Sequence, residues 1–92
     1  MNQTEKKLYE AEVQRLIDNP EYQDKPLELF LKLVRAADTF RLMPGFCEAA
    51  GISRFSPNNW IYGGEIPYTK NFIKILSAMG FDVKIVRKPD VR

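Results

Sequence analysis

Apolar residues recur along most of the chain with the three- and four-residue spacing of amphipathic helices. In the clearest case they follow an i, i+3, i+4, i+7, i+10 pattern: Leu27, Phe30, Leu31, Val34 and Ala37. Pro26 precedes this pattern, and proline is favoured at the first helical position because its missing N–H is not needed there. The spacing therefore predicts a helix from Pro26 to about Phe40 that buries one face.

A second helix is expected from Thr4 to about Asp18. Threonine is a favoured helix cap, and Asn19-Pro20 ends the segment because proline disfavours helical geometry in the residue before it. The apolar residues form two neighbouring rows at near-helical spacing. One row holds Leu8, Ala11 or Glu12, and Leu16; the other holds Tyr9, Val13 and Ile17. The polar residues 21–25 are typical of a linker.

Two elements are expected near the end of the sequence. Thr69 caps a helix that Gly80 ends, with one apolar face formed by Phe72, Ile73, Leu76 and Met79. Residues 81–86 then alternate largely between apolar and polar side chains. This alternation predicts a strand, which Pro89 ends.

A lone strand leaves its backbone donors and acceptors unpaired, and the sequence suggests no second strand. The simplest partner is the same strand of another copy, related by a twofold axis. We therefore expect a homodimer with contacts from Phe81, Val83, Lys84, Ile85 and Val86. The alternative is that the strand folds back on Tyr9 and Leu16 of the first helix.

The chain also contains two short helices around a glycine, the pattern of a helix-turn-helix. The helices are expected over about residues 43–50 and 53–62. Gly51 permits the positive φ of the turn, Ile52 fills the gap between the helices, and Trp60 anchors the second helix in the core. The outer side of the second helix is left with Arg54, Phe55, Ser56, Asn58, Asn59 and Tyr62.

Pro57 leaves two starting points for this second helix. If Ser53 is the N-cap, Pro57 is the fourth helical residue and its missing N–H removes the first intrahelical hydrogen bond. If Ser56 is the cap, Pro57 takes the favoured first position. Arg54 and Phe55 then form an extended approach to the helix, and we favour this second interpretation.

The predicted elements amount to a mainly α fold of five helices with a C-terminal β-strand. Ninety-two residues make one domain, and 45% of them are hydrophobic, enough for a core without disulfides. We divide the chain into an N-terminal helix and linker over residues 1–25, a core over residues 26–80, and a strand and tail over residues 81–92.

The composition argues against an enzyme. Histidine is absent and Cys47 is the one cysteine, so acid–base chemistry, a nucleophile and a zinc site would each lack their usual residues. We expect neither a metal nor a cofactor. A single cysteine cannot form an internal disulfide, which favours the reducing cytoplasm. We expect a cytoplasmic protein because the sequence has no secretory signal and no run of about 18 apolar residues.

Charge is distributed unevenly between the two halves. Residues 1–50 hold 7 Lys and Arg against 9 Asp and Glu, a net charge of −2, whereas residues 51–92 hold 7 against 3, a net charge of +4. The positive field therefore lies in the half that contains the second short helix, which favours an anionic partner.

The helix pair and its surroundings resemble the phage-repressor-like (Cro/cI or xenobiotic-response-element) helix-turn-helix family over about residues 43–80. The family pattern is matched in order by Cys47, Gly51, Ile52, Ser53, Gly63, Pro67 and Ala78-Met79-Gly80. The strand-like ending and the helix over residues 26–40 are similar to one branch, the addiction-module antidote (antitoxin) proteins. The family usually has alanine in place of Cys47 and often glutamine near Met43, so the phosphate contact that this glutamine braces is not expected here.

The resemblance implies a five-helix lambda-repressor-like DNA-binding domain whose second short helix enters the major groove. Arg54 then contacts guanine or a phosphate, and Asn59 pairs with adenine. Phe55 packs on a thymine methyl group or folds back into the core. The predicted DNA interface comprises Ser53, Arg54, Phe55, Ser56, Asn58, Asn59, Tyr62, Thr69, Lys70 and Asn71.

We therefore expect a sequence-specific transcriptional regulator on a palindromic operator in double-stranded DNA, either an autorepressing antitoxin or a phage or mobile-element repressor. An antitoxin also needs a surface for its toxin. The candidate is the acidic N-terminal segment, with Glu5, Glu10, Glu12, Asp18, Glu21 and Asp24. The alternative function is a protein–protein interaction module that keeps the helix-turn-helix scaffold and has lost DNA binding.

Overall fold

The computed structural model describes residues 2–84 and Arg87. This part of the chain is mainly helical, as the sequence predicted, and contains five α-helices and one 3₁₀ helix. In chain order they are α1 (Gln3–Asp18), η1 (Pro20–Tyr22), α2 (Pro26–Thr39), α3 (Met43–Ala50), α4 (Ser56–Ile61) and α5 (Thr69–Ala78).

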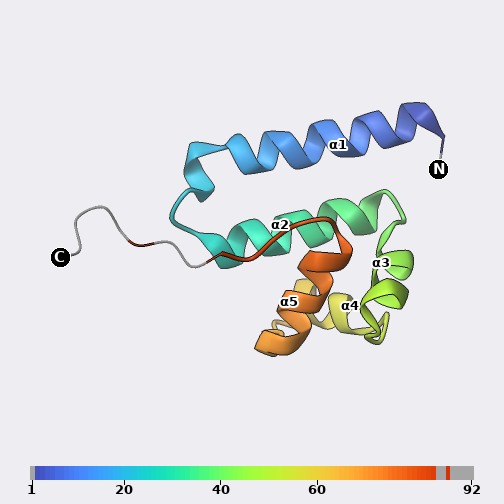
Figure 1. The fold of residues 1–92 in the computed structure, drawn as a ribbon, viewed down its shortest axis with the longest axis vertical. Coiled ribbons are helices and arrows are strands. Elements are labelled where there is room, and N and C mark those ends of the chain that lie inside the picture. The colour runs from blue at the N-terminus through green and yellow to red at the C-terminus, as the bar shows by residue number, and fades with distance from the viewer. Residues whose placement is uncertain (1, 85–86, 88–92) are drawn as a thin grey trace.

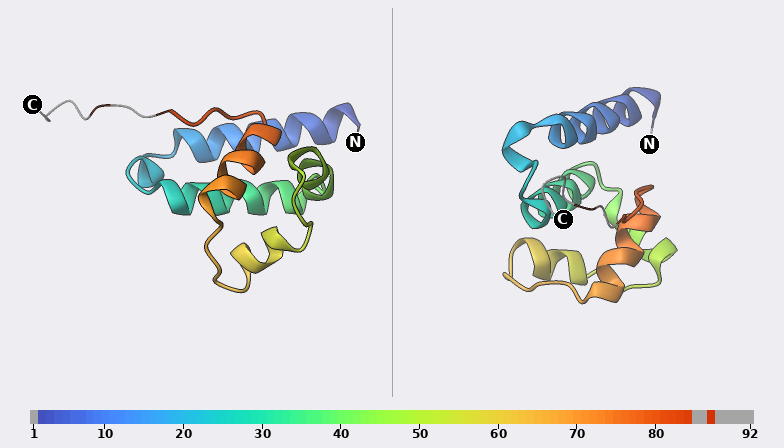
Figure 2. Two further views of the ribbon diagram at one scale, coloured as in Figure 1. Left: turned by 60° about the horizontal axis from the view of Figure 1, so that its bottom comes forward. Right: turned by 60° about the vertical axis from the view of Figure 1, so that its left-hand side comes forward.

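Helix α2 is the central element of the fold. Helix α1 lies antiparallel along one side of α2, and α3, α4 and α5 gather on the other side (Figure 1). In the right-hand view of Figure 2, α1 lies at the top and α4 at the bottom, with α2 between them. Because α2 is covered from both sides, its burial determines how the other helices are placed.

The burial of α2 is wider than the single face predicted from its spacing. Phe30, Val34 and Ala37 of that face are buried as expected, but Leu27 is 43% exposed. Leu33 and Ala36 are also buried. The reason is that α1 covers a second face of α2, which the three- and four-residue pattern of one face does not reveal.

Helix α1 is held against α2 by an aromatic cluster at the end of α2. The ring of Tyr9 meets that of Phe40 edge-on with 5.7 Å between centroids, and it lies 6.5 Å from the ring of Phe46 in α3. Burial raises the pKa of the Tyr9 hydroxyl. This hydroxyl is buried without a hydrogen-bond partner among the described residues.

Two predicted helix caps are wrong. The N-cap of α1 is Asn2, whose side chain accepts a hydrogen bond from the Glu5 N–H at 2.8 Å, so Thr4 lies inside the helix. Asparagine is as good a cap as threonine, and α1 therefore begins earlier. Thr69 is the first residue of α5 and Tyr68 is its N-cap, with no side-chain hydrogen bond to the helix.

Three helices end in the same left-handed turn. After α3 and α5 the left-handed residue is a glycine, Gly51 with φ 71° and Gly80 with φ 91°. After α2 it is Arg41, with φ 60°. The Arg41 N–H bonds to the Asp38 carbonyl at 3.0 Å and the Leu42 N–H to the Ala37 carbonyl at 2.9 Å, the pair of bonds of a Schellman motif. Arg41 therefore occupies a conformation that favours glycine.

The predicted strand over residues 81–86 does not form within this chain as far as Lys84. Ile85 and Val86 lie outside the described residues. The Phe81 N–H bonds to the Leu76 carbonyl at 2.8 Å and completes the end of α5, and residues 82–84 have no regular structure. A strand needs a partner strand, and the described part of the chain supplies none. Ile17 of α1 and residues 81–84 line one groove.

Removing the Tyr9 hydroxyl tests whether this group lacks a hydrogen-bond partner. Because a buried polar group without a partner costs about 1–3 kcal/mol, we expect Tyr9→Phe to leave the free energy of unfolding unchanged or to raise it. Tyr9→Ala, the control that also removes the ring, should lower it by about 3–5 kcal/mol. Urea unfolding at neutral pH measures both, and a loss of more than about 1 kcal/mol in Tyr9→Phe would show that the hydroxyl is hydrogen-bonded.

The left-handed turns give a second prediction, in which two substitutions change the free energy of unfolding in opposite directions. Arg41→Gly should raise the free energy of unfolding by up to about 1 kcal/mol, because the relief of backbone strain is partly offset by a more flexible unfolded chain. Gly51→Ala should lower it by about 1–2 kcal/mol.

Gly45 supplies the matched control for these two variants. It lies inside α3 with open space where a Cβ would stand, so Gly45→Ala should stabilise the protein by about 0.5–1 kcal/mol. Thermal and urea unfolding distinguish the three variants. A stabilised Gly51→Ala would contradict the left-handed turn at that position.

Candidate nucleic-acid interface

The sharp bend between α3 and α4 is made by Gly51. Its N–H bonds to the Glu48 carbonyl at 3.2 Å, and the Ile52 N–H bonds to the Cys47 carbonyl at 3.0 Å. These bonds close the end of α3, and Ile52 is half-buried against the core. The chain then turns into α4, which lies across the end of the molecule opposite α1 (Figure 2). The predicted glycine hinge is confirmed.

Helix α4 begins one turn after Ser53, close to the interpretation that we favoured. Its first residue is Ser56 and its N-cap is Phe55, so Ser56 is not the cap. Pro57 takes the second position, where a missing N–H leaves no hydrogen bond unmade. The approach to the helix is a turn rather than an extended segment. In this turn the Ser53 carbonyl accepts from the Ser56 N–H at 3.1 Å, and the Ser53 hydroxyl accepts from the Phe55 N–H at 3.2 Å.

The two faces of α4 are sharply divided. Pro57 and Trp60 are buried, and the Trp60 ring lies 5.7 Å from that of Phe30 in α2. Asn58 and Asn59 are exposed. Trp60 therefore anchors α4 in the core, as predicted. Its burial leaves the side of α4 with Asn58 and Asn59 facing solvent.

Gly63 allows the backbone to pass close to Asn59 at the end of α4. A Cβ at this position would stand 2.9 Å from the carbonyl oxygen of Asn59, so a larger residue does not fit without movement of the backbone. The same carbonyl accepts from the N–H groups of Gly63 at 3.0 Å and Glu65 at 3.1 Å. These two bonds hold the backbone at Asn59 while its side chain stays exposed.

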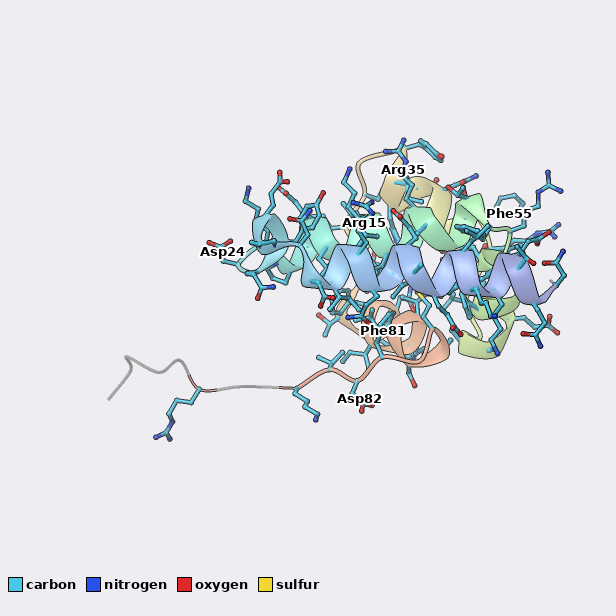
Figure 3. The ribbon with its side chains drawn as sticks, turned by 90° about the horizontal axis from the view of Figure 1, so that it is seen from above. Arg15, Asp24, Arg35, Phe55, Phe81 and Asp82 are labelled. Atoms are coloured by element: carbon cyan, nitrogen blue, oxygen red, sulfur yellow. The ribbon has the colours of Figure 1, made fainter. Side chains whose placement is uncertain are left out.

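Arg54 and Phe55 form an exposed pair just before α4. The Phe55 side chain is 67% exposed, so the alternative in which it folds into the core is wrong. The guanidinium carbon of Arg54 lies 5.9 Å from the Phe55 ring centroid, within the range of a cation–π contact. Figure 3 shows Phe55 at the periphery of the molecule. The two side chains therefore present a cation beside an aromatic surface.

A residue that the sequence analysis missed lies at the other end of α4. The guanidinium carbon of Arg35 in α2 is 5.8 Å from the ring centroid of Tyr62, which is 64% exposed. Arg35 was overlooked because it occupies an outward position of a core helix, where a charge is usually only solvated. Its contact with Tyr62 depends on how α2 and α4 pack, which periodicity does not specify.

Arg54 also lies beside the first turn of α3. A shallow hollow of about 300 Å³ is lined by Arg54 together with Pro44, Gly45, Cys47, Glu48 and Ile52. Gly45 exposes backbone here because no side chain covers it. Glu48 adds a negative charge to the same hollow, so the positive field around Arg54 is partly reduced there.

The remaining predicted DNA contacts are spread over the start of α5. Thr69 and Lys70 are exposed and Asn71 is half-buried. They follow a loop whose Ile66 and Tyr68 are 74% and 82% exposed. The structure thus brings Arg54 and Phe55 together and sets Tyr62 beside Arg35. No hydrogen bond or ion pair among the described residues joins Thr69–Asn71 to either pair.

Cys47 of α3 lines the same hollow as Arg54. Cys47 is only 1% exposed, and burial raises the pKa of its thiol, so it is not poised as a nucleophile. Among the described residues, no group of three or more potential ligands is placed to hold a metal ion. No helix in residues 2–84 combines the length and the apolar character needed to cross a bilayer.

Comparison of the chain with protein-family models, with curated proteins and with solved structures finds no match.

Proposed function

We propose that this protein is a sequence-specific DNA-binding regulator that reads double-stranded DNA with the outer side of α4. The single observation that supports this most is the division of α4, in which Pro57 and Trp60 face the core and Asn58 and Asn59 face solvent. Asparagine pairs with adenine through two hydrogen bonds, and arginine pairs in the same way with guanine. An exposed row of such side chains is what base reading requires.

The charges near α4 support an anionic partner. Arg35, Arg54 and Lys70 are exposed cations. The ion pair found among the described residues joins Arg15 with Glu12 in α1 and involves none of the three. Exposed cations attract the phosphate backbone, which supplies most of the affinity of proteins for DNA. Arg41, which precedes α3, adds a fourth exposed cation.

The order of α2 to α5 and the glycine hinge at Gly51 favour the lambda-repressor-like class within the mainly helical fold. We propose a cytoplasmic homodimer on a palindromic operator, with half-sites about one helical turn apart. Its role is repression of its own operon, as an antitoxin or as a phage or mobile-element regulator. In the antitoxin case the acidic N-terminal segment, residues 5–24, binds the toxin.

A protein-binding module is the second candidate function, and one observation favours it. Several large apolar side chains near α4 are exposed, among them Phe55, Tyr62, Ile66 and Tyr68. Exposed apolar groups are common at protein interfaces. Salt distinguishes the two functions because an interface of this kind depends on ionic strength much less than phosphate contacts do.

Salt dependence is the first test of DNA binding. The protein is mixed with a duplex from upstream of its own gene and with a random duplex library, and binding is measured by gel shift. Between 50 and 200 mM salt the affinity should fall roughly 10³- to 10⁵-fold if the dimer makes 6–10 phosphate contacts. No shift at 50 mM salt on either DNA would contradict the proposed function.

Arg54→Ala tests base reading at one position. If Arg54 pairs with guanine, its loss should cost about 1–3 kcal/mol of binding free energy and relax the preference at one base pair. Lys74→Ala, a charge change on the half-buried side of α5, is the control and should preserve the preference. An equal loss on all sequences would make Arg54 a phosphate contact instead.

Phe55 gives a prediction that needs no change of charge. An exposed ring in the major groove packs on a thymine methyl group, so replacing thymine by uracil in the selected operator should weaken binding by the wild type. Phe55→Ala should bind the thymine operator more weakly than the wild type does. Replacing thymine by uracil should not change the affinity of this variant. Gel shifts with the four combinations form a cycle, and equal sensitivity of both proteins to uracil would exclude this contact.

A further inference from the structure

Residues 81–84 lie along an apolar groove on the side of the molecule away from Phe55. In Figure 3, where α1 lies in front, Phe81 and Asp82 appear on the opposite side of α1 from Phe55. The groove has a volume of about 350 Å³ and is lined by this segment and by apolar side chains of α1, α2 and α5, including Ile17, Leu29, Leu33 and Phe72. This surface is separate from the proposed DNA interface.

The segment has the alternation of a strand edge. Phe81 is half-buried against the core, whereas Val83 is 50% exposed beside the groove. Asp82 and Lys84 are exposed. The backbone N–H and C=O groups of residues 82–84 make no hydrogen bonds to other described residues. Such an edge can bind a second strand.

We propose that this edge pairs with the same edge of a second copy, antiparallel, with the twofold axis passing at Val83. This inference deepens the homodimer of the proposed function and rests on that part of it. An antiparallel pair centred on Val83 sets Asp82 opposite the partner's Lys84, and by symmetry Lys84 opposite the partner's Asp82. Opposite charges directly across two strands stabilise the pair.

Other arrangements of the same segment lose this complementarity. Moving the axis to Asp82 or to Lys84 sets two like charges against each other at the centre. A parallel pair in register opposes Asp82 to Asp82 and Lys84 to Lys84. An axis midway between residues 82 and 83 sets Asp82 opposite Val83 of the second copy. The contact between the two Val83 side chains is then lost, and each valine faces a charge. Val83 is therefore the centre that satisfies both charges.

The same centre covers the exposed apolar surface. The two Val83 side chains meet beside the grooves of both copies, where Ile17 and Leu29 are available to them. The contact is self-complementary, as an isologous interface requires. The partner that fits this surface is thus a second copy of this chain.

Charge reversal tests the register. Asp82→Lys and Lys84→Asp each turn two attractive pairs into two repulsive ones, so each variant should raise the dimer dissociation constant roughly tenfold or more. The double variant, with the two charges exchanged, should recover the wild-type constant. An equimolar mixture of the two single variants should also dimerise, because each then meets opposite charges. Sedimentation equilibrium at low ionic strength measures the constants.

Glu10→Lys in the exposed part of α1 is the matched control, since it changes the net charge as Asp82→Lys does. It should leave the dissociation constant unchanged, and circular dichroism should show that all variants are folded. A wild type that is monomeric at 100 µM, or single variants that dimerise as well as the wild type, would overturn the inference. A dimer with the expected charge pattern that binds no DNA would overturn the proposed function and leave this interface standing.

Discussion

The burial of Phe30 is the interaction on which the rest of the structure depends. Its side chain, in the first half of α2, is 2% exposed, and its ring lies 5.7 Å from that of Trp60 and 4.6 Å from that of Phe72. One side chain thus joins α2 to both α4 and α5. Burying aromatic rings of this size contributes more free energy than any polar contact in the described residues.

Helix α4 illustrates this dependence because it is only six residues long. An isolated helix of that length is unstable in water, so its conformation comes from packing rather than from its own hydrogen bonds. Trp60 and Pro57 supply that packing from one face. The positions of Arg54 and Asn59 are therefore consequences of the core, and any change at Phe30 would alter the candidate interface without touching it.

The sequence predicted those features that depend on neighbouring residues. The bounds of α3, the left-handed turn at Gly51 and the burial of Trp60 all follow from local patterns, and all three are found. Features that depend on packing between helices were missed. They include the second buried face of α2, which requires α1 beside it, and the contact of Arg35 with Tyr62. The strand expected at residue 81 needs a partner strand, which the described part of the chain does not supply.

The N-cap of α1 was predicted wrongly because two nearby residues are both suited to that position. Asn2 and Thr4 are both good caps, and no rule of spacing decides between them. Arg41 is the opposite case, because no pattern places an arginine in a left-handed turn. Its conformation follows from the two hydrogen bonds that end α2.

The position of Cys47 has a practical consequence for labelling this molecule. The native thiol is sealed between α3 and the core, so a maleimide dye or spin label reaches it only when the protein opens. A cysteine introduced on the exposed surface can then be modified selectively while the native one is retained. Distances between helices can be measured in solution with the packing around α3 left intact.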